Sequence, residues 1–116
     1  MTKIYDFLKL PISTSQDLSV AALDYTTTLT RKFRVKSISF KFSQAITETI
    51  TITRDSKVGA NYDAVLRNKD LVAETTYVYV PERGDDAYNA GDKIRIQCTD
   101  ANSVGIVYVE LKLVEG

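Results

Sequence analysis

The sequence contains no histidine, no tryptophan and a single cysteine, Cys98. Without histidine the chain lacks the commonest general base and metal ligand, so neither a Ser-His-Asp nor a Cys-His catalytic arrangement can be assembled. One cysteine excludes a disulfide within the chain, and no GxxxxGK[ST] or GxGxxG segment provides a phosphate-binding loop. These absences predict a protein that is not an enzyme and that carries no metal or other cofactor.

An excess of charge of either sign is also missing. Fifteen Lys and Arg balance fifteen Asp and Glu, and no stretch concentrates one sign, so the sequence predicts no nucleic-acid or membrane partner. No apolar run approaches the ~20 residues that cross a bilayer, and the apolar N-terminal run is interrupted by Asp6 and Lys9. We therefore expect neither a signal peptide nor a membrane helix, and we expect synthesis in the cytoplasm.

What the sequence does contain is alternation of apolar and polar residues. Between residues 36 and 42, Ile38, Phe40 and Phe42 fall on one side, the period-two pattern of a half-buried strand. A break at 43–45 separates this strand from a β-branched strand at 47–53, which we expect to pair with it in antiparallel fashion. The further expected strands are 62–67, 75–80, 93–98 and 105–114, with weaker ones at 18–23 and 26–30.

The facing of several side chains follows from the same pattern. We expect Val78 and Val80 to point into the core, and Cys98 to be a small core residue beside Ile94 and Ile96. A turn-forming cluster at 99–103 makes the last two strands the best hairpin candidate.

About seven or eight short strands predict an all-β fold, an antiparallel two-sheet β-sandwich of jelly-roll type, because a single sheet would leave its apolar face in water. A small barrel is the alternative. At 116 residues the chain is long enough for one core. We assign residues 1–15 to an N-terminal arm or edge strand and residues 16–116 to a single β-sandwich domain.

Acidic residues are the remaining candidates for chemistry. A carboxylate pair could perform acid and base catalysis, and a group of loop acids could bind calcium. Fifteen acids produce such pairs by chance, and the loop spacing matches no EF-hand, so we expect a solvated loop without metal. The residues concerned are Glu48, Glu74, Glu82, Asp85 and Asp86 for the pair, and Glu82, Asp85, Asp86 and Asp92 for calcium.

Two groups of residues are candidates for a partner interface. Tyrosines opposite the valines of their strands form either a partner-facing stripe or ordinary cross-strand pairs. The apolar N-terminus either docks on its own domain or adds an arm to a neighbouring subunit. The predicted interface residues are Ile4, Tyr5, Phe7, Leu8, Leu10, Tyr77, Tyr79 and Tyr108.

Between residues 35 and 113 the chain also has a characteristic order of segments. These are Val35-Lys36-Ser37-Ile38-Ser39-Phe40-Lys41-Phe42-Ser43, Glu48-Thr49-Ile50-Thr51-Ile52-Thr53-Arg54-Asp55-Ser56, Asn61-Tyr62-Asp63-Ala64-Val65-Leu66, Tyr79-Val80-Pro81, Ala90-Gly91-Asp92-Lys93-Ile94-Arg95-Ile96 and Gly105-Ile106-Val107-Tyr108-Val109. This order resembles small β-sandwich proteins encoded among the structural genes of tailed bacteriophages and prophages. The resemblance covers about two thirds of the chain and defines a scaffold without site residues.

The resemblance implies a virion component made in the host cytoplasm: a capsid decoration or cement protein, a head or tail accessory subunit, or a domain of a fibre. Its partners would be other virion proteins, such as major capsid or tail subunits, and copies of itself. The alternative is a receptor- or carbohydrate-binding module of a tail fibre or spike, with Tyr77, Tyr79, Tyr88 and Tyr108 as contacts. A third hypothesis is an enzyme that uses paired carboxylates.

Overall fold

The computed structural model describes residues 12–115, and this part of the chain is built almost entirely of strands. Its only helical element is a single 3-10 turn, so the predicted all-β class is confirmed. The elements are β1 (Ile12–Asp17), β2 (Leu23–Thr28), β3 (Phe33–Ile46), β4 (Thr49–Asp55), η1 (Ala60–Tyr62), β5 (Ala64–Asp70), β6 (Glu74–Tyr79), β7 (Ala87–Tyr88), β8 (Lys93–Cys98) and β9 (Ile106–Glu115).

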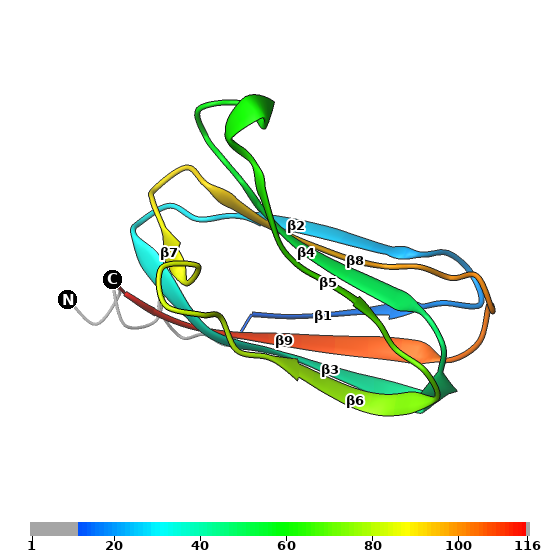
Figure 1. Cartoon of the computed structure of the whole chain (residues 1–116). Helices are drawn as coiled ribbons and strands as arrows, with labels where there is room; N and C mark the ends of the chain where they lie inside the picture. Colours follow the sequence, from blue (N-terminus) through cyan, green and yellow to red (C-terminus); the bar gives the residue numbers. More distant parts are fainter. Residues whose placement is uncertain (1–11, 116) are drawn as a thin grey trace.

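The strands form two antiparallel sheets that pack face to face (Figure 1). The first sheet has the order β1-β9-β3-β6, with β7 pairing the start of β3, and the second has the order β2-β8-β4-β5. Strands that follow one another in the chain lie in opposite sheets at most connections, so the chain crosses the core repeatedly. This is the strand order of a jelly roll. The predicted two-sheet sandwich is therefore confirmed.

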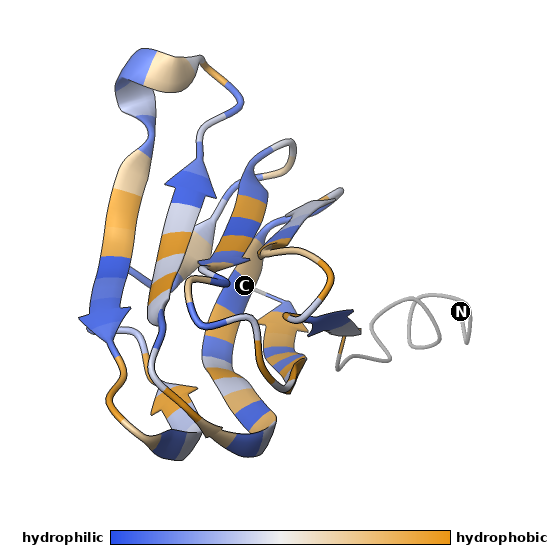
Figure 2. Cartoon of the chain, turned by 90° about the vertical axis from the view of Figure 1, so that its right-hand side faces the viewer, coloured by the Kyte–Doolittle hydropathy of each residue, from blue (hydrophilic) through white to orange (hydrophobic). Residues whose placement is uncertain are grey.

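The core lies between the sheets and is made by the alternating residues of each strand (Figure 2). From the first sheet, Ile38 and Phe40 of β3 are at most 1% exposed; from the second, Ile94 and Ile96 of β8 are fully buried. Each such side chain contributes roughly 1.5–3 kcal/mol through removal of apolar surface from water. Leu18, Leu29 and Leu71 close the core from the connections between strands.

Two predicted strand pairings are wrong. We expected β8 and β9 to form a hairpin and β4 to pair with β3, but each pair is divided between the two sheets. Turn-forming residues mark where the chain reverses, and they do not specify whether it returns in the same sheet or in the sheet about 10 Å away. The segment 99–105 is long enough for that crossing.

Strand boundaries also differ from expectation. The break expected at 43–45 is a shift of register between Lys41 and Ile46 within a continuous β3. The weak strand expected at 18–23 is a turn, in which Asp17 Oδ1 accepts hydrogen bonds from the backbone N–H and hydroxyl of Ser19. β1 instead begins at Ile12, inside the segment assigned to an N-terminal arm or edge strand, and pairs with β9 at the edge of the first sheet.

The expected facing of β6 is reversed. Tyr79 is 3% exposed, whereas Val78 and Val80 are 54% and 62% exposed. Tyr79 lies opposite Ile38, and Tyr77 lies opposite Phe40 with the two ring centroids 6.0 Å apart. Period-two alternation divides a strand into two faces without saying which faces inward, and here the tyrosines face inward because their rings bury more apolar area than valine does.

Candidate functional site

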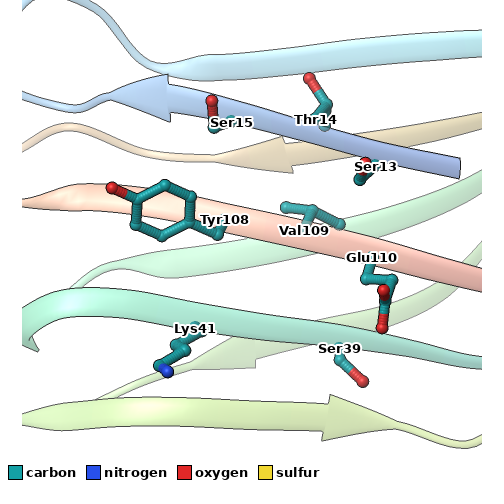
Figure 3. A pocket seen from close by; sticks show the side chains of 8 residues that line it. All are labelled: Ser13, Thr14, Ser15, Ser39, Lys41, Tyr108, Val109 and Glu110. Carbon is teal, nitrogen blue, oxygen red and sulfur yellow. The ribbon is translucent and has the colours of Figure 1, made fainter.

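The outer face of the first sheet contains a shallow groove across β1, β9 and β3 (Figure 3). We call it the first-sheet groove. Its volume is about 520 Å³. The residues that line it are Ser13, Thr14, Ser15, Ser39, Lys41, Tyr108, Val109 and Glu110.

Strand register places the outward groups of this groove in two rows. One row is Ser15, Tyr108 and Lys41, which are cross-strand neighbours on β1, β9 and β3. The next row, two residues along each strand, is Ser13, Glu110 and Ser39. Thr14 and Val109 belong to the opposite, inward side of their strands, and Figure 3 shows Thr14 pointing away from Tyr108.

The polar groups of the groove have no partners within the described part of the chain. No hydrogen bond or ion pair joins the side chains of Ser39, Lys41 or Glu110 to another residue between 12 and 115, and Tyr108 is 47% exposed. The groove therefore combines one aromatic surface with hydroxyl, ammonium and carboxylate groups that are available to a ligand.

The edge of β6 is a second candidate site, suited to protein contacts. Among residues 12–115, β6 has a hydrogen-bonded neighbour on one side only, which is β3. Val78 of β6 and Val80, which follows it, are exposed, and Glu74 at its beginning is the only charged residue of β6. An edge strand of this kind presents unpaired backbone groups to a partner strand.

The neighbouring edge strand β5 is protected by contrast. Lys69 and Arg67 lie opposite Ile50 and Ile52, so both charged side chains start from the inward face. The guanidinium of Arg67 lies over the ring of Tyr79, 5.6 Å from its centroid, which joins the two edges of the sandwich. Inward-pointing charges disfavour pairing with a foreign strand, and β6 has a single charged residue, Glu74, which lies opposite Ile46 at its beginning.

Exposed apolar residues are frequent in one segment of the chain. Of the ten large hydrophobic side chains exposed within residues 12–115, six belong to the segment that runs from the loop before β5 to the end of β6. They are Val58, Tyr62, Val65, Val72, Val78 and Val80. Scattered surface apolar residues are normal. Of these six, Val78 in β6 and Val80 directly after it lie at the open edge, whereas the η1 turn that contains Tyr62 lies on the other side of the molecule (Figure 1).

The acidic candidates are not brought together. Within residues 12–115, no three Asp, Glu or Cys side chains are close enough to hold a metal ion. Asp92, which was expected to belong to a solvated loop, is 6% exposed and accepts hydrogen bonds from the backbone N–H groups of Lys57 and Asn89. Asp86 lies 3.5 Å from Arg34 in an ion pair.

Glu48 is also buried, 4% exposed, and all the hydrogen bonds of its carboxylate come from the loop between β8 and β9. It is therefore a structural residue. Asp70 lines the same shallow pocket, where its carboxylate accepts a hydrogen bond from the hydroxyl of Thr49 at 2.7 Å. The sequence context of Glu48, a single acid between two β-branched strands, gives no signal of its structural role, because the loop that it binds is about fifty residues away.

The predicted interface tyrosines differ in how exposed their side chains are. Tyr79 is buried, Tyr77 is half-buried, and Tyr108 alone of the three is exposed, so they form no shared stripe. Tyr88, a predicted sugar contact, is 2% exposed and packs under the guanidinium of Arg54. The other predicted interface residues, Ile4, Tyr5, Phe7, Leu8 and Leu10, lie outside the described residues.

Comparison with known proteins gives no assignment: no protein-family model matches the chain, and no curated protein matches it. Within residues 12–115 there is also no helix of the length and apolar character that crossing a membrane requires. Two surfaces of the molecule are therefore the candidates for function, the first-sheet groove and the β6 edge.

Proposed function

We propose that this chain is a non-enzymatic structural subunit of a tailed-bacteriophage virion. Its role would be that of a capsid decoration or cement protein, or of a head–tail accessory subunit. It would act through protein–protein contacts with other virion proteins and with copies of itself, after synthesis in the host cytoplasm.

The observation that carries this proposal is the open edge of β6. A strand from a partner that pairs with this edge satisfies its backbone groups and also covers the outward side chains of Val78 and Val80. Covering apolar surface contributes about 25 cal/mol per Å², before the entropy cost of association is subtracted. Many copies bound in this way reinforce a shell.

Three further features support the proposal. Jelly rolls occur in viral capsid domains. The formal net charge of +0 limits repulsion between copies that pack closely. The order of segments between Val35 and Val109 resembles small structural proteins of tailed phages.

The proposal is tested by placing charge on the β6 edge. The double variant Val78→Lys, Val80→Lys leaves the core unchanged, since both side chains are exposed. We expect it to remain folded by circular dichroism but to lose co-sedimentation with capsids or tails of the phage whose structural genes flank its own. Self-association, measured by light scattering, should fall as well.

The matched control is Thr26→Lys, Thr28→Lys on β2, an exposed edge strand of the other sheet. This variant adds the same charge and should bind particles as the wild type does. Equal binding by the β6 variant and the control would show that the β6 edge is not the attachment surface. A deletion of residues 1–10 tests the predicted N-terminal arm separately, since attachment should then be lost from a domain that still folds.

A further inference from the structure

The exposed ring of Tyr108 lies on the outer face of the first sheet, where the neighbouring side chains do not cover it. Figure 3 shows the ring over β9, with a face of the ring turned away from the sheet. Its cross-strand neighbours are Ser15, which is small, and Lys41, which is flexible. Neither covers the ring, so its face is available for stacking against a flat apolar surface, such as the C–H face of a pyranose.

Three serines make the groove hollow. Ser13, Ser15 and Ser39 occupy outward strand positions where the β-branched or aromatic residues favoured in strands would fill the space. Each serine hydroxyl both donates and accepts hydrogen bonds, which matches the hydroxyl groups of a sugar. The hollow is thus lined by groups that recognise hydroxyls, beside a ring that recognises a pyranose face.

The second row places charged groups within reach of the same ligand. Rows on one face of a sheet are about 7 Å apart along the strand, so a sugar stacked on Tyr108 extends over Glu110. Glu110 supplies acceptors, and Lys41 supplies donors. One negative and one positive side chain cancel, which favours a neutral ligand over an acidic or basic one.

From this arrangement we propose that the first-sheet groove is a binding site for a neutral oligosaccharide, with Tyr108 as the stacking surface. Lys41, Glu110 and the serines hydrogen-bond the sugar hydroxyls. This activity is additional to the assembly role. The groove is lined by residues of β1, β9 and β3, and it adjoins the β6 assembly surface where Val78 lies opposite Ser39.

Nuclear magnetic resonance of the ¹⁵N-labelled full chain tests the site. The probes are cellohexaose, maltohexaose, xylohexaose and chitohexaose, with oligogalacturonate as the acidic comparison. We expect at least one neutral probe to shift amide signals concentrated in β1, β3 and β9. Tyr108→Ala should weaken that binding about tenfold or more, as loss of a central aromatic contact does, and Tyr108→Phe should retain most of it.

The matched control is Tyr62→Ala, because Tyr62 is 66% exposed in η1 and away from the groove. It should bind as the wild type does, and so should the Thr26→Lys, Thr28→Lys variant, which alters the other sheet. The proposal is overturned if none of the four neutral probes shifts the groove amides, if only oligogalacturonate does, or if Tyr108→Ala binds like Tyr62→Ala. Shifts confined to the β6 edge would likewise exclude the groove.

Discussion

The carboxylate of Glu48 accepts a hydrogen bond from the backbone N–H of Asn102 at 2.8 Å, across 54 positions of sequence. The same carboxylate accepts the hydroxyl of Thr99 at 2.6 Å and the backbone N–H of Ala101 at 2.9 Å. Glu48 lies where the chain crosses from β3 to β4, and its partners lie where it crosses from β8 to β9. One buried side chain therefore fixes two crossings that have no strand pairing of their own.

Replacement of Glu48 by alanine should lower the free energy of unfolding by about 3 kcal/mol, because three donors lose their acceptor in a place from which water is largely excluded. Urea denaturation followed by circular dichroism measures the loss. Glu74→Ala is the control, since Glu74 is exposed at the start of β6, and it should change stability by less than about 0.5 kcal/mol. Similar losses in the two variants would contradict the role of Glu48.

Two variants of Tyr79 separate the contribution of its ring to the free energy of unfolding from that of its hydroxyl. The hydroxyl is buried and makes no hydrogen bond with a described residue, so Tyr79→Phe should change the free energy of unfolding by less than about 1 kcal/mol. Tyr79→Ala removes the ring from the core and from beneath Arg67, and should cost about 3–5 kcal/mol. The same urea titration compares the two. A larger loss in the phenylalanine variant would show that the hydroxyl, rather than the ring, stabilises this edge.

The fold class could be predicted because apolar and polar residues alternate in β3, β8 and β9. This alternation depends only on neighbouring residues and shows that each strand has one buried and one exposed face. Ile38 and Phe40 pointed to the core for that reason, and they are buried. Pairing between sheets is not local. The segment after Cys98 reads equally well as a hairpin turn or as a crossing, and only the packing of the whole chain decides between them.

The candidate sites were less predictable, for a related reason. The sequence identified Tyr108 as outward-facing but placed Tyr79 on the outside as well, because alternation alone does not rank the two faces of β6. The groove could not be foreseen, since it depends on Ser13 of β1 and Ser39 of β3 lying on either side of β9. Cross-strand neighbours follow from register, and no residue in this sequence specifies that register.

Cys98 should be unreactive in the folded protein. Burial in the core, together with the negative charges of Glu48 and Asp100, raises the pKa of its thiol to about 12. Little thiolate exists near neutral pH, and the sulfur is inaccessible to reagents. We expect Ellman's reagent at pH 8 to label the protein only after unfolding in urea. A Thr26→Cys variant, exposed on β2, should gain one rapidly labelled thiol. Equally rapid labelling of the native wild type would contradict the burial of Cys98.

The ion pair between Asp24 and Arg95 should make a small, pH-dependent contribution to stability. Nε and Nη2 of Arg95 donate hydrogen bonds to the carboxylate of Asp24, at 3.0 and 2.9 Å. These hydrogen bonds lower the pKa of Asp24 below its ordinary value of 3.8. A lowered pKa in the folded state means that the stabilisation is present above the ordinary carboxyl pKa and disappears as the pH falls through the lower, folded-state value.

Asp24→Asn should therefore lower the urea midpoint slightly at pH 7, and the difference from the wild type should shrink as the pH falls below about 4. The effect is small because both side chains are partly exposed and water screens the pair. Added salt should reduce the difference at pH 7 as well. Urea titrations of both proteins across this pH range measure it, and a difference that grows toward acidic pH would contradict the proposed sign.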